Sequence, residues 1–310
     1  MRILHVGIPN YALSKSFAKV GEYKFFDWTD WTAIPGNEAN LRRKSIETSA
    51  EFNPDITFFQ LQNPDPYDGA TVKQMRGFKI NWSWDVREPL PKWFLDVATG
   101  VDTTCFTNEY DVEQIRSCGF RADFLQNGFD ADTFTPDGSM LENVPEIVFM
   151  GNHYDETYNF PLSDFREKMV RFLGDKYGSR FAVYGFGWNF RTDCFVHREQ
   201  KEAAAYRTCK IAINVSHYEL ERYTSDRMFR MMGSGAFCLC KWYPGVEKDF
   251  VDGVHIKTWK TLDELHDLIE YYLQHPEERM QIAKTGCELV RSNYTLDNLV
   301  EKIIALKNDA

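Results

Sequence analysis

The order of strand and helix patterns along this 310-residue chain is the feature that most constrains its fold. Apolar or alternating stretches typical of strands, such as 2–7 and 78–85, are separated by helical patterns such as 39–52. The alternation breaks at 133–146, a polar stretch with two prolines and a glycine, and then restarts. Strand–helix alternation in two halves predicts an α/β protein of two doubly wound domains with mainly parallel sheets.

The break also predicts the domain boundaries. We expect a Rossmann-like first domain at 1–134, a linker at 135–146, a second domain at 147–293, and a terminal helix at 294–310 that crosses back to the first domain. Ligands of such sheets bind at the carboxyl ends of the strands. With two such domains, we expect the site in the cleft between them.

Composition excludes several classes of protein. The chain is 43% hydrophobic and 15% aromatic, which suits a large core, and its net charge of −10 disfavours a generic nucleic-acid surface. The sequence contains no run of 18 apolar residues, so we expect no membrane-spanning helix. Six residues precede Gly7, which is too few for the apolar part of a signal peptide. The seven cysteines are scattered and form no Cys-x-x-Cys motif. We therefore expect a cytoplasmic protein with reduced thiols.

The stretch FKINWSWDVR, 78–87, ends a strand with charged residues. Its alternation predicts one buried face, and it delivers Asp85 and Arg87 beside Trp84. A carboxylate there can take the proton of an acceptor hydroxyl. We expect burial against the tryptophans to raise the pKa of Asp85 and Arg87 to lower it. The alternative is an Asp85–Arg87 ion pair that braces the strand end.

Two further residues follow the first strand. Gly7 and Asn10 lie in a loop expected at the same edge, where the backbone can approach the acceptor or a donor sugar. The loop lacks a Gly-x-Gly-x-x-Gly motif, so it does not predict a nicotinamide site. His5, inside the strand, is interpreted as a core residue. His217, just past a strand, is interpreted as a solvated loop residue, and the alternative is that it faces the cleft.

The stretch 217–240, HYELERYTSDRMFRMMGSGAFCLC, predicts a short helix that begins after Ser225 and ends at Gly233. Its N-terminus offers free N–H groups and a partial positive charge, which suit an anion. Arg227 lies in the first turn and Arg230 one turn later, where guanidinium groups can reinforce a diphosphate contact. The alternative is that both arginines form surface ion pairs with nearby acids, namely Glu219, Glu221 or Asp226.

A resemblance supports the diphosphate interpretation. The pattern Ser-x-Arg-x-x-x-x-x-Gly-x-Gly, followed by an apolar strand, resembles the donor-binding segment of GT-B glycosyltransferases. It is most similar to the variant in CgeB-like spore-maturation proteins and related viral glycosyltransferases. The similarity continues through GVEKDFVDGVHIKTW, LDELHDLIEYYLQHPEERMQIAKTGCELV and NYTLDNL, and FLQNGFDADTFTP, EIVFMGN and NWSWDVR resemble earlier motifs.

The resemblance implies a GT-B fold, two domains facing a central cleft, and a role for individual residues. Ser225 and Arg227 would contact the donor diphosphate, with Tyr223 beside it. Gly151 and Asn152 would line the cleft at the donor phosphates or sugar, and the turn of Gly185 and Phe186 would flank the base. Apart from the resemblance, strand-end position and chemistry make Asp85 the candidate catalytic base, with Gly7, Asn10, Trp84 and Arg87 expected on the acceptor side.

Two positions depart from simple expectations. Many GT-B enzymes have a glutamate for the donor sugar where this chain has Arg230, which puts that contact in doubt. Asp130-Ala131-Asp132 matches the metal motif of the other glycosyltransferase fold, but it lies in a turn before the expected linker, so we expect no metal site there. Helix termini and basic side chains are expected to stabilise the leaving diphosphate instead.

The sequence thus predicts a metal-independent GT-B hexosyl- or pentosyltransferase that uses a nucleotide sugar, with UDP as the expected nucleotide, and no cofactor. The acceptor would be a glycan or small molecule. One alternative is a non-catalytic nucleotide-sugar-binding module, favoured by Arg230. Another is glycosylation of modified bases in DNA, for which 41–44 and Lys73, Arg76 and Lys79 are the local basic features. Retention or inversion, the sugar and the oligomeric state stay open.

Overall fold

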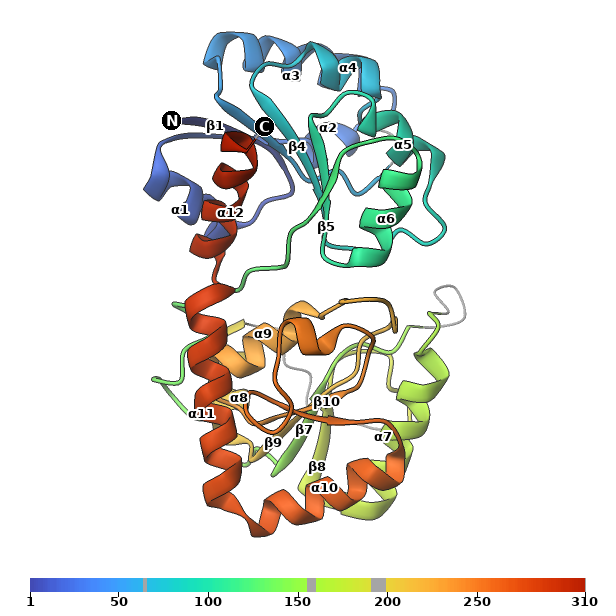
Figure 1. Cartoon of the computed structure of the whole chain (residues 1–310), viewed down its shortest axis with the longest axis vertical. Helices are drawn as coiled ribbons and strands as arrows, with labels where there is room; N and C mark the ends of the chain where they lie inside the picture. Colours follow the sequence, from blue (N-terminus) through green and yellow to red (C-terminus); the bar gives the residue numbers. More distant parts are fainter. Residues whose placement is uncertain (64–65, 155–159, 191–198, 310) are drawn as a thin grey trace. The chain divides into compact units, whose positions relative to one another are not determined.

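The computed structural model describes residues 1–63, 66–154, 160–190 and 199–309. The chain divides into two compact units, each with its own parallel sheet (Figure 1). The first unit is Met1–Asn127 together with the terminal segment from Leu296, and the second is Gly128–Thr295. Within these described ranges, no helix is long and apolar enough to cross a membrane.

The first unit has a six-stranded sheet in the order β2-β1-β3-β4-β5-β6, with every neighbouring pair parallel. Its strands are β1 (Arg2–Gly7), β2 (Glu22–Asp27), β3 (Ile56–Phe59), β4 (Phe78–Ser83), β5 (Thr103–Phe106) and β6 (Ala122–Phe124). Its helices are α1 (Tyr11–Val20), α2 (Thr29–Thr32), α3 (Glu38–Phe52), α4 (Gly69–Gln74), α5 (Lys92–Ala98), α6 (Glu109–Ser117) and α12 (Leu296–Asn308).

Helices cover both faces of this sheet. Leu299 and Ile303 of α12 pack in one cluster with Phe17 of α1 and with Ile80 and Trp82 of β4. The terminal helix therefore crosses back onto the first domain, as predicted. The opposite face packs against α3 to α6.

The prediction that β4 has one buried face is wrong. The polar residues Asn81 and Ser83 are fully buried, as are Ile80 and Trp82. The reason is that β4 is an interior strand of a parallel sheet, and helices cover such sheets on both sides. The polar half of an alternating pattern is here a buried polar layer rather than a solvated face.

The second unit has a five-stranded parallel sheet in the order β11-β10-β9-β7-β8. Its strands are β7 (Ile147–Met150), β8 (Phe181–Tyr184), β9 (Ile211–Asn214), β10 (Cys238–Lys241) and β11 (Lys257–Trp259). Its helices are α7 (Ser163–Tyr177), α8 (Glu199–Thr208), α9 (Asp226–Gly233), α10 (Leu262–Gln274) and α11 (Pro276–Asn293). Short 3-10 helices lie at η2 (Gly178–Arg180) and η3 (Val246–Lys248).

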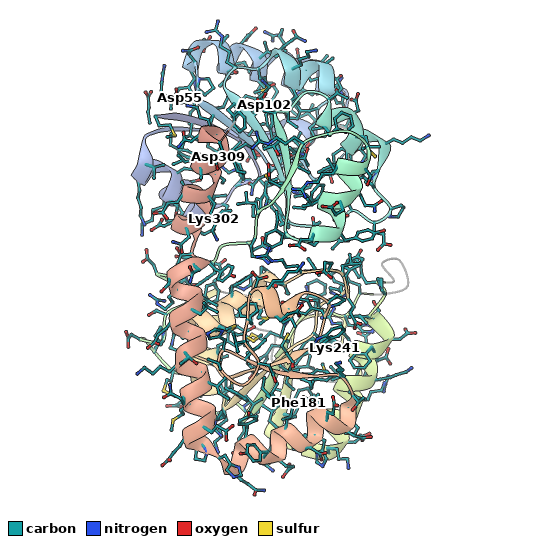
Figure 2. All side chains as sticks on the ribbon, in the orientation of Figure 1. Asp55, Asp102, Phe181, Lys241, Lys302 and Asp309 are labelled. Atoms are coloured by element: carbon teal, nitrogen blue, oxygen red, sulfur yellow. The ribbon has the colours of Figure 1, made fainter. Side chains whose placement is uncertain are left out.

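Local sequence signals set several helix ends. Thr261 and Glu264 form the capping box that begins α10, and Pro276 occupies the first turn of α11. At the amino edge of the first sheet, Asp55 and Asp102 precede β3 and β5, and both are labelled in Figure 2. Asp102 accepts a hydrogen bond from the Lys79 backbone N–H at 2.7 Å.

The predicted linker at 135–146 belongs to the second unit, and the chain changes unit at Asn127–Gly128 instead. Leu141 and Val144 pack against the hydrophobic cluster of this unit. The Arg207 guanidinium also donates to the Thr135 carbonyl oxygen at 2.9 Å. The polar composition predicted a linker, but the apolar contacts of Leu141 and Val144 pack the segment against the second unit.

Candidate functional site

Asp85 lies just past the carboxyl end of β4, as predicted, but it is not buried. Its side chain is 59% exposed, so the expected burial against the tryptophans does not occur. Trp84 is half-buried and packs edge-on against Trp82, with ring centroids 5.5 Å apart. Asp85 thus presents its carboxylate to solvent from a rigid strand end.

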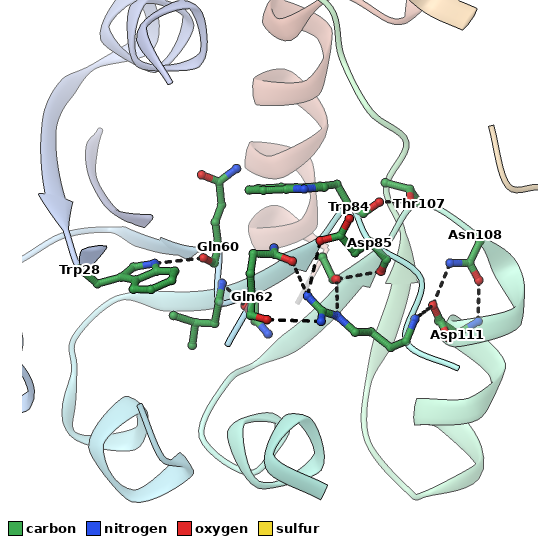
Figure 3. Close-up of polar contacts among 12 residues, drawn as sticks. Trp28, Gln60, Gln62, Trp84, Asp85, Thr107, Asn108 and Asp111 are labelled. Atoms are coloured by element: carbon green, nitrogen blue, oxygen red, sulfur yellow. Dashed lines mark hydrogen bonds and ion pairs between the residues drawn. The ribbon is translucent and has the colours of Figure 1, made fainter. Parts of the chain in front are cut away.

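Arg87 holds this strand end in place. Its Nε donates to the Ser83 hydroxyl at 3.0 Å, and its Nη2 donates to the Gln62 side-chain oxygen. Its backbone N–H donates to the Asp111 carboxylate at 2.9 Å. The nearest Arg87 and Asp85 side-chain atoms are 3.9 Å apart, which is a loose ion pair. Figure 3 draws these contacts, with Gln62, Asp85 and Asp111 labelled. Arg87 therefore stabilises the strand end through hydrogen bonds to Gln62, Ser83 and Asp111, which are shorter than its 3.9 Å contact with Asp85.

Gly7 and Asn10 have structural explanations. A Cβ atom at Gly7 would overlap His5 and the Gln60 side chain, so the position needs glycine for packing. The Asn10 side chain caps α1 by accepting from the Leu13 N–H at 3.0 Å. His5 is fully buried between Tyr23 and Gln60, as interpreted from the sequence, and burial lowers its pKa to about 4.

In the second unit, the carboxyl ends of β7 and β8 meet through their backbones. The Gly151 N–H donates to the Tyr184 carbonyl at 2.8 Å, and the Asn152 side chain accepts from the Phe186 N–H at 3.3 Å. Gly185 has φ +142°, and a Cβ there would overlap the Gly151 carbonyl. Phe186 is 50% exposed, and its ring contacts that of Tyr154 edge-on, with centroids 6.1 Å apart. The structure brings these four predicted residues together.

The same edge contains Arg166, which the sequence reasoning missed. Arg166 is on α7 and only 1% exposed, yet its Nε and Nη2 have no hydrogen-bond partner among the described residues. A Cβ at Gly151 would overlap Nη2, so this glycine makes room for the guanidinium. Burial lowers the pKa of Arg166, and the nearby charge of Arg227 lowers it further. A buried cation without an acidic partner is costly and marks a candidate anion site.

His217 does not lie in a solvated loop, so that interpretation is wrong. Its ring is half-buried and contacts the Arg166 guanidinium, with Nη1 2.5 Å from Nδ1. Burial lowers the pKa of His217 to about 2, with Arg166 and Arg227 as further causes. The imidazole is therefore neutral and adds no positive charge. Its place after β9, at the carboxyl edge, was the signal that could have linked it to the site.

The N-terminus of α9 lies close enough to act on this cluster electrostatically, since Arg227 affects both Arg166 and His217. Ser225 is the N-cap residue, as predicted, but its hydroxyl does not cap the helix. The Asp226 carboxylate accepts from the Arg227 N–H at 2.8 Å. Tyr223 is half-buried next to Tyr218, with ring centroids 6.0 Å apart. The first turn of α9 thus adds a second guanidinium to the edge that holds Arg166.

Arg230 is engaged in ion pairs rather than in a ligand contact. Its Nη1 is 3.0 Å from Asp226 and its Nε 3.0 Å from Glu202 of α8. The ion-pair alternative raised for Arg230 is therefore correct with respect to Asp226, and its donor-binding role stays a prediction. Burial raises the pKa of Glu202. The guanidinium neutralises acids between α8 and α9.

Asp130 of the Asp-x-Asp motif organises a turn. Its carboxylate accepts from the Asp132 N–H at 3.1 Å and from the Thr133 hydroxyl at 2.6 Å. The described part of the chain contains no cluster of three histidine, cysteine or acidic residues able to hold a metal.

Comparisons with known proteins address the fold. Residues 166–305 match the model of a glycosyl transferase-like family. The matched stretch begins at Arg166 and includes α9 and its N-terminus. No curated protein sequence matches the chain.

Solved structures are similar over the whole chain. Sucrose-phosphate synthase from Thermosynechococcus elongatus aligns with a TM-score of 0.73 at 10% identity, covering 100% of this chain and 99% of that one. A glycosyltransferase from Rickettsia africae gives 0.67 at 11% identity, covering 99% and 98%. Anabaena HepE in complex with UDP-glucose gives 0.62 at 11% identity, covering 100% of both chains. The fold is GT-B, as predicted.

Proposed function

We propose that this protein is a glycosyltransferase that moves a sugar from a nucleotide diphosphate sugar, with UDP as the nucleotide, to a hydroxyl acceptor. The GT-B fold and the family match over 166–305 support sugar transfer in general. The complex of HepE with UDP-glucose supports the choice of UDP. The motifs similar to CgeB-like and viral enzymes support the finer placement within glycosyltransferases.

The observation that carries the proposal is the guanidinium of Arg166. It is buried, it lacks partners for two nitrogens among the described residues, and Arg227 acts on it electrostatically. Among the described residues, no ion pair with an acid is found for Arg166, and burial of its charge is costly. A diphosphate would supply the missing charge and accept hydrogen bonds from both guanidiniums. The N-terminus of α9 adds a favourable dipole for the same anion.

The proposed chemistry follows from these groups. When the bond between the donor sugar and the diphosphate breaks, the electron pair moves to the leaving phosphate oxygen. Arg166 and Arg227 stabilise that developing charge, which is the largest single contribution in many enzymes of this kind. Asp85 takes the proton of the acceptor hydroxyl as the new bond forms. Its exposed carboxylate suits this role better than a buried ion pair would. Phe186 flanks the uracil base with its exposed ring.

A non-catalytic nucleotide-sugar-binding module is the second candidate. It is favoured by Arg230, whose ion pairs with Asp226 and Glu202 fill the position where related enzymes have a sugar-binding glutamate. DNA glycosylation has less support, because several of the basic residues considered for it are paired within the first unit: Arg42 with Asp68, Arg43 and Lys44 with Glu47, and Lys79 with Asp102.

Calorimetric titration with UDP, GDP, ADP and CDP, first without metal and then with magnesium, tests the proposal. We expect saturable, metal-independent binding of UDP by the wild type and none by Arg166→Ala. Arg171→Ala is the matched control, because Arg171 is on the same helix but 53% exposed and paired with Glu167. Absence of binding to every nucleotide would refute the donor site. Binding of UDP-glucose without transfer or hydrolysis would favour the non-catalytic module.

A further inference from the structure

The loop that leads into α9, residues 220–225, has an unusual backbone. Arg222 adopts φ +56°, in the left-handed region that non-glycine residues rarely occupy. Among the described residues, the other non-glycine positions with positive φ are asparagines, Asn53 and Asn143, which tolerate it better. A long side chain in this conformation must be held there by its surroundings, and such residues cluster at ligand sites.

A buried carboxylate holds Arg222. The guanidinium of Arg222 donates through Nε and Nη2 to the two oxygens of Asp249, at 2.9 and 2.8 Å. The Asp249 side chain is 1% exposed. The same carboxylate accepts a third hydrogen bond, from the Tyr294 hydroxyl at 2.9 Å. This two-point geometry fixes the direction of the guanidinium as well as its position.

The loop is anchored on both sides of Tyr223. On one side, the Arg222 N–H donates to the Pro244 carbonyl at 2.7 Å. On the other, the Thr224 hydroxyl hydrogen-bonds the Tyr243 hydroxyl at 2.6 Å, and both groups are buried. Residues 243–249 therefore determine where Tyr223 and the first turn of α9 point.

We propose that Asp249 is a positioning residue for the nucleotide-sugar donor. Through Arg222, it holds the 220–225 loop so that Tyr223, Ser225 and the first turn of α9 face the donor diphosphate. This inference rests on the proposed donor site. Asp249 acts through Arg222 and does not itself touch the ligand. A buried ion pair is weak evidence for a purely stabilising role, because its desolvation offsets much of its attraction.

Tyr294 provides the matched control. It donates to the same carboxylate, but from the end of α11, where its carbonyl accepts the Phe129 N–H at 3.0 Å. Its ring stacks on Phe229 of α9, with centroids 4.8 Å apart. Tyr294→Phe keeps this stacking and leaves the Arg222–Asp249 pair in place, while removing one hydrogen bond from Asp249.

The experiment compares Asp249→Asn, Arg222→Asn and Tyr294→Phe with the wild type. UDP affinity is measured by calorimetry, stability by thermal unfolding, and loop order by hydrogen exchange of the amides of 223–228. We expect Asp249→Asn and Arg222→Asn to weaken UDP binding about tenfold, as loss of outer contacts does at other preorganised sites. Exchange at 223–228 should accelerate in both. Tyr294→Phe should lower Tm and keep UDP affinity within about twofold of wild type.

Steady-state kinetics with the nucleotide-sugar donor distinguish a positioning role of Asp249 from a general loss of folded protein. The positioning role predicts a higher KM for the donor, with kcat at saturating donor nearly unchanged. If all three variants lower Tm alike and bind UDP as the wild type does, the positioning role is refuted. Arg222→Asn decides the matter if Asp249→Asn does not fold, since asparagine tolerates the left-handed backbone. A wild type that binds no nucleotide refutes the proposed function itself, whereas normal binding by Arg222→Asn refutes the positioning role alone.

Discussion

Arg87 and Arg166 lie at the carboxyl edges of two similar parallel sheets, but their surroundings differ. Arg87 has the Gln62 side chain and the Ser83 hydroxyl as partners, and it lies over the rings of Trp93 and Phe94. Arg166 is more deeply buried, contacts the neutral His217, and has two nitrogens without hydrogen bonds among the described residues. The fold places an arginine at the equivalent edge of each sheet. The side chains around each arginine determine whether its guanidinium is hydrogen-bonded within the protein or has nitrogens left to bind a ligand.

The two edges therefore suit different tasks. The first unit presents the exposed carboxylate of Asp85 on a braced strand end. The second places the Arg166 guanidinium beside Gly151, which leaves space for it. The comparison predicts that substitutions at one edge lower the rate of sugar transfer, and that substitutions at the other lower the affinity for the donor.

The largest expected effect is that of Asp85→Asn. Removal of the proposed general base should lower kcat by about 10²–10⁴-fold, because the acceptor proton then has no positioned carboxylate. UDP affinity should stay unchanged, since the proposed donor contacts are on the second unit. Steady-state kinetics and calorimetry on the same preparation check both halves. Sugar transfer within threefold of wild type would remove Asp85 from the mechanism.

The second largest effect is expected when Arg166 and Arg87 are each replaced by methionine in separate variants. Arg166→Met should weaken UDP binding about 100-fold, as expected for loss of a buried charge partner. It should also raise the Tm of the unliganded protein, because an uncompensated buried charge disappears. Arg87→Met should do the opposite, lowering Tm and leaving UDP affinity intact. Equal behaviour of the two variants would contradict the contrast between the edges.

A smaller effect concerns pH and stability. His5 has a pKa of about 4 in the folded state because of burial, below its ordinary value of 6.5. Below pH 6.5 the unfolded chain binds the proton first, so stability falls as pH decreases toward 4. From pH 7.5 to 5.0 this should cost about 2 kcal/mol, a loss absent in His5→Gln. Urea unfolding of both proteins at the two pH values measures it. His217 should contribute in the same direction.

The smallest expected effect compares two glycines. At either Gly151 or Gly7, an added Cβ overlaps a neighbouring side chain, Arg166 or His5. Both alanine variants should be destabilised by about 1–3 kcal/mol through overpacking. We expect Gly151→Ala alone to weaken UDP binding, about tenfold, because it displaces the guanidinium. If Gly7→Ala weakens UDP binding as much, the loss reflects general destabilisation rather than the anion site.

Much of the candidate site was predictable from its place at strand ends. The carboxyl end of β4 led to Asp85 because parallel sheets bind ligands there, whereas Gly151 and Phe186 were implied by the resemblance to GT-B glycosyltransferases. The sequence reasoning missed Arg166 because it lies in the first turn of an amphipathic helical pattern, where an arginine normally faces water. The ion pair of Arg230 with Glu202 could not be predicted because Glu202 comes from another helix.

The sequence by itself determined the alternation of strands and helices and the two parallel sheets, since these depend on local periodicity, caps and turns. The GT-B fold was implied by the resemblance of its motifs to a known family. Only the tertiary structure decided that 135–146 packs onto the second unit, that β4 is buried on both faces, and which arginines have acidic partners. The physical reason is that burial and ion pairing depend on residues far apart in the chain, and their energies change with the surroundings that packing creates.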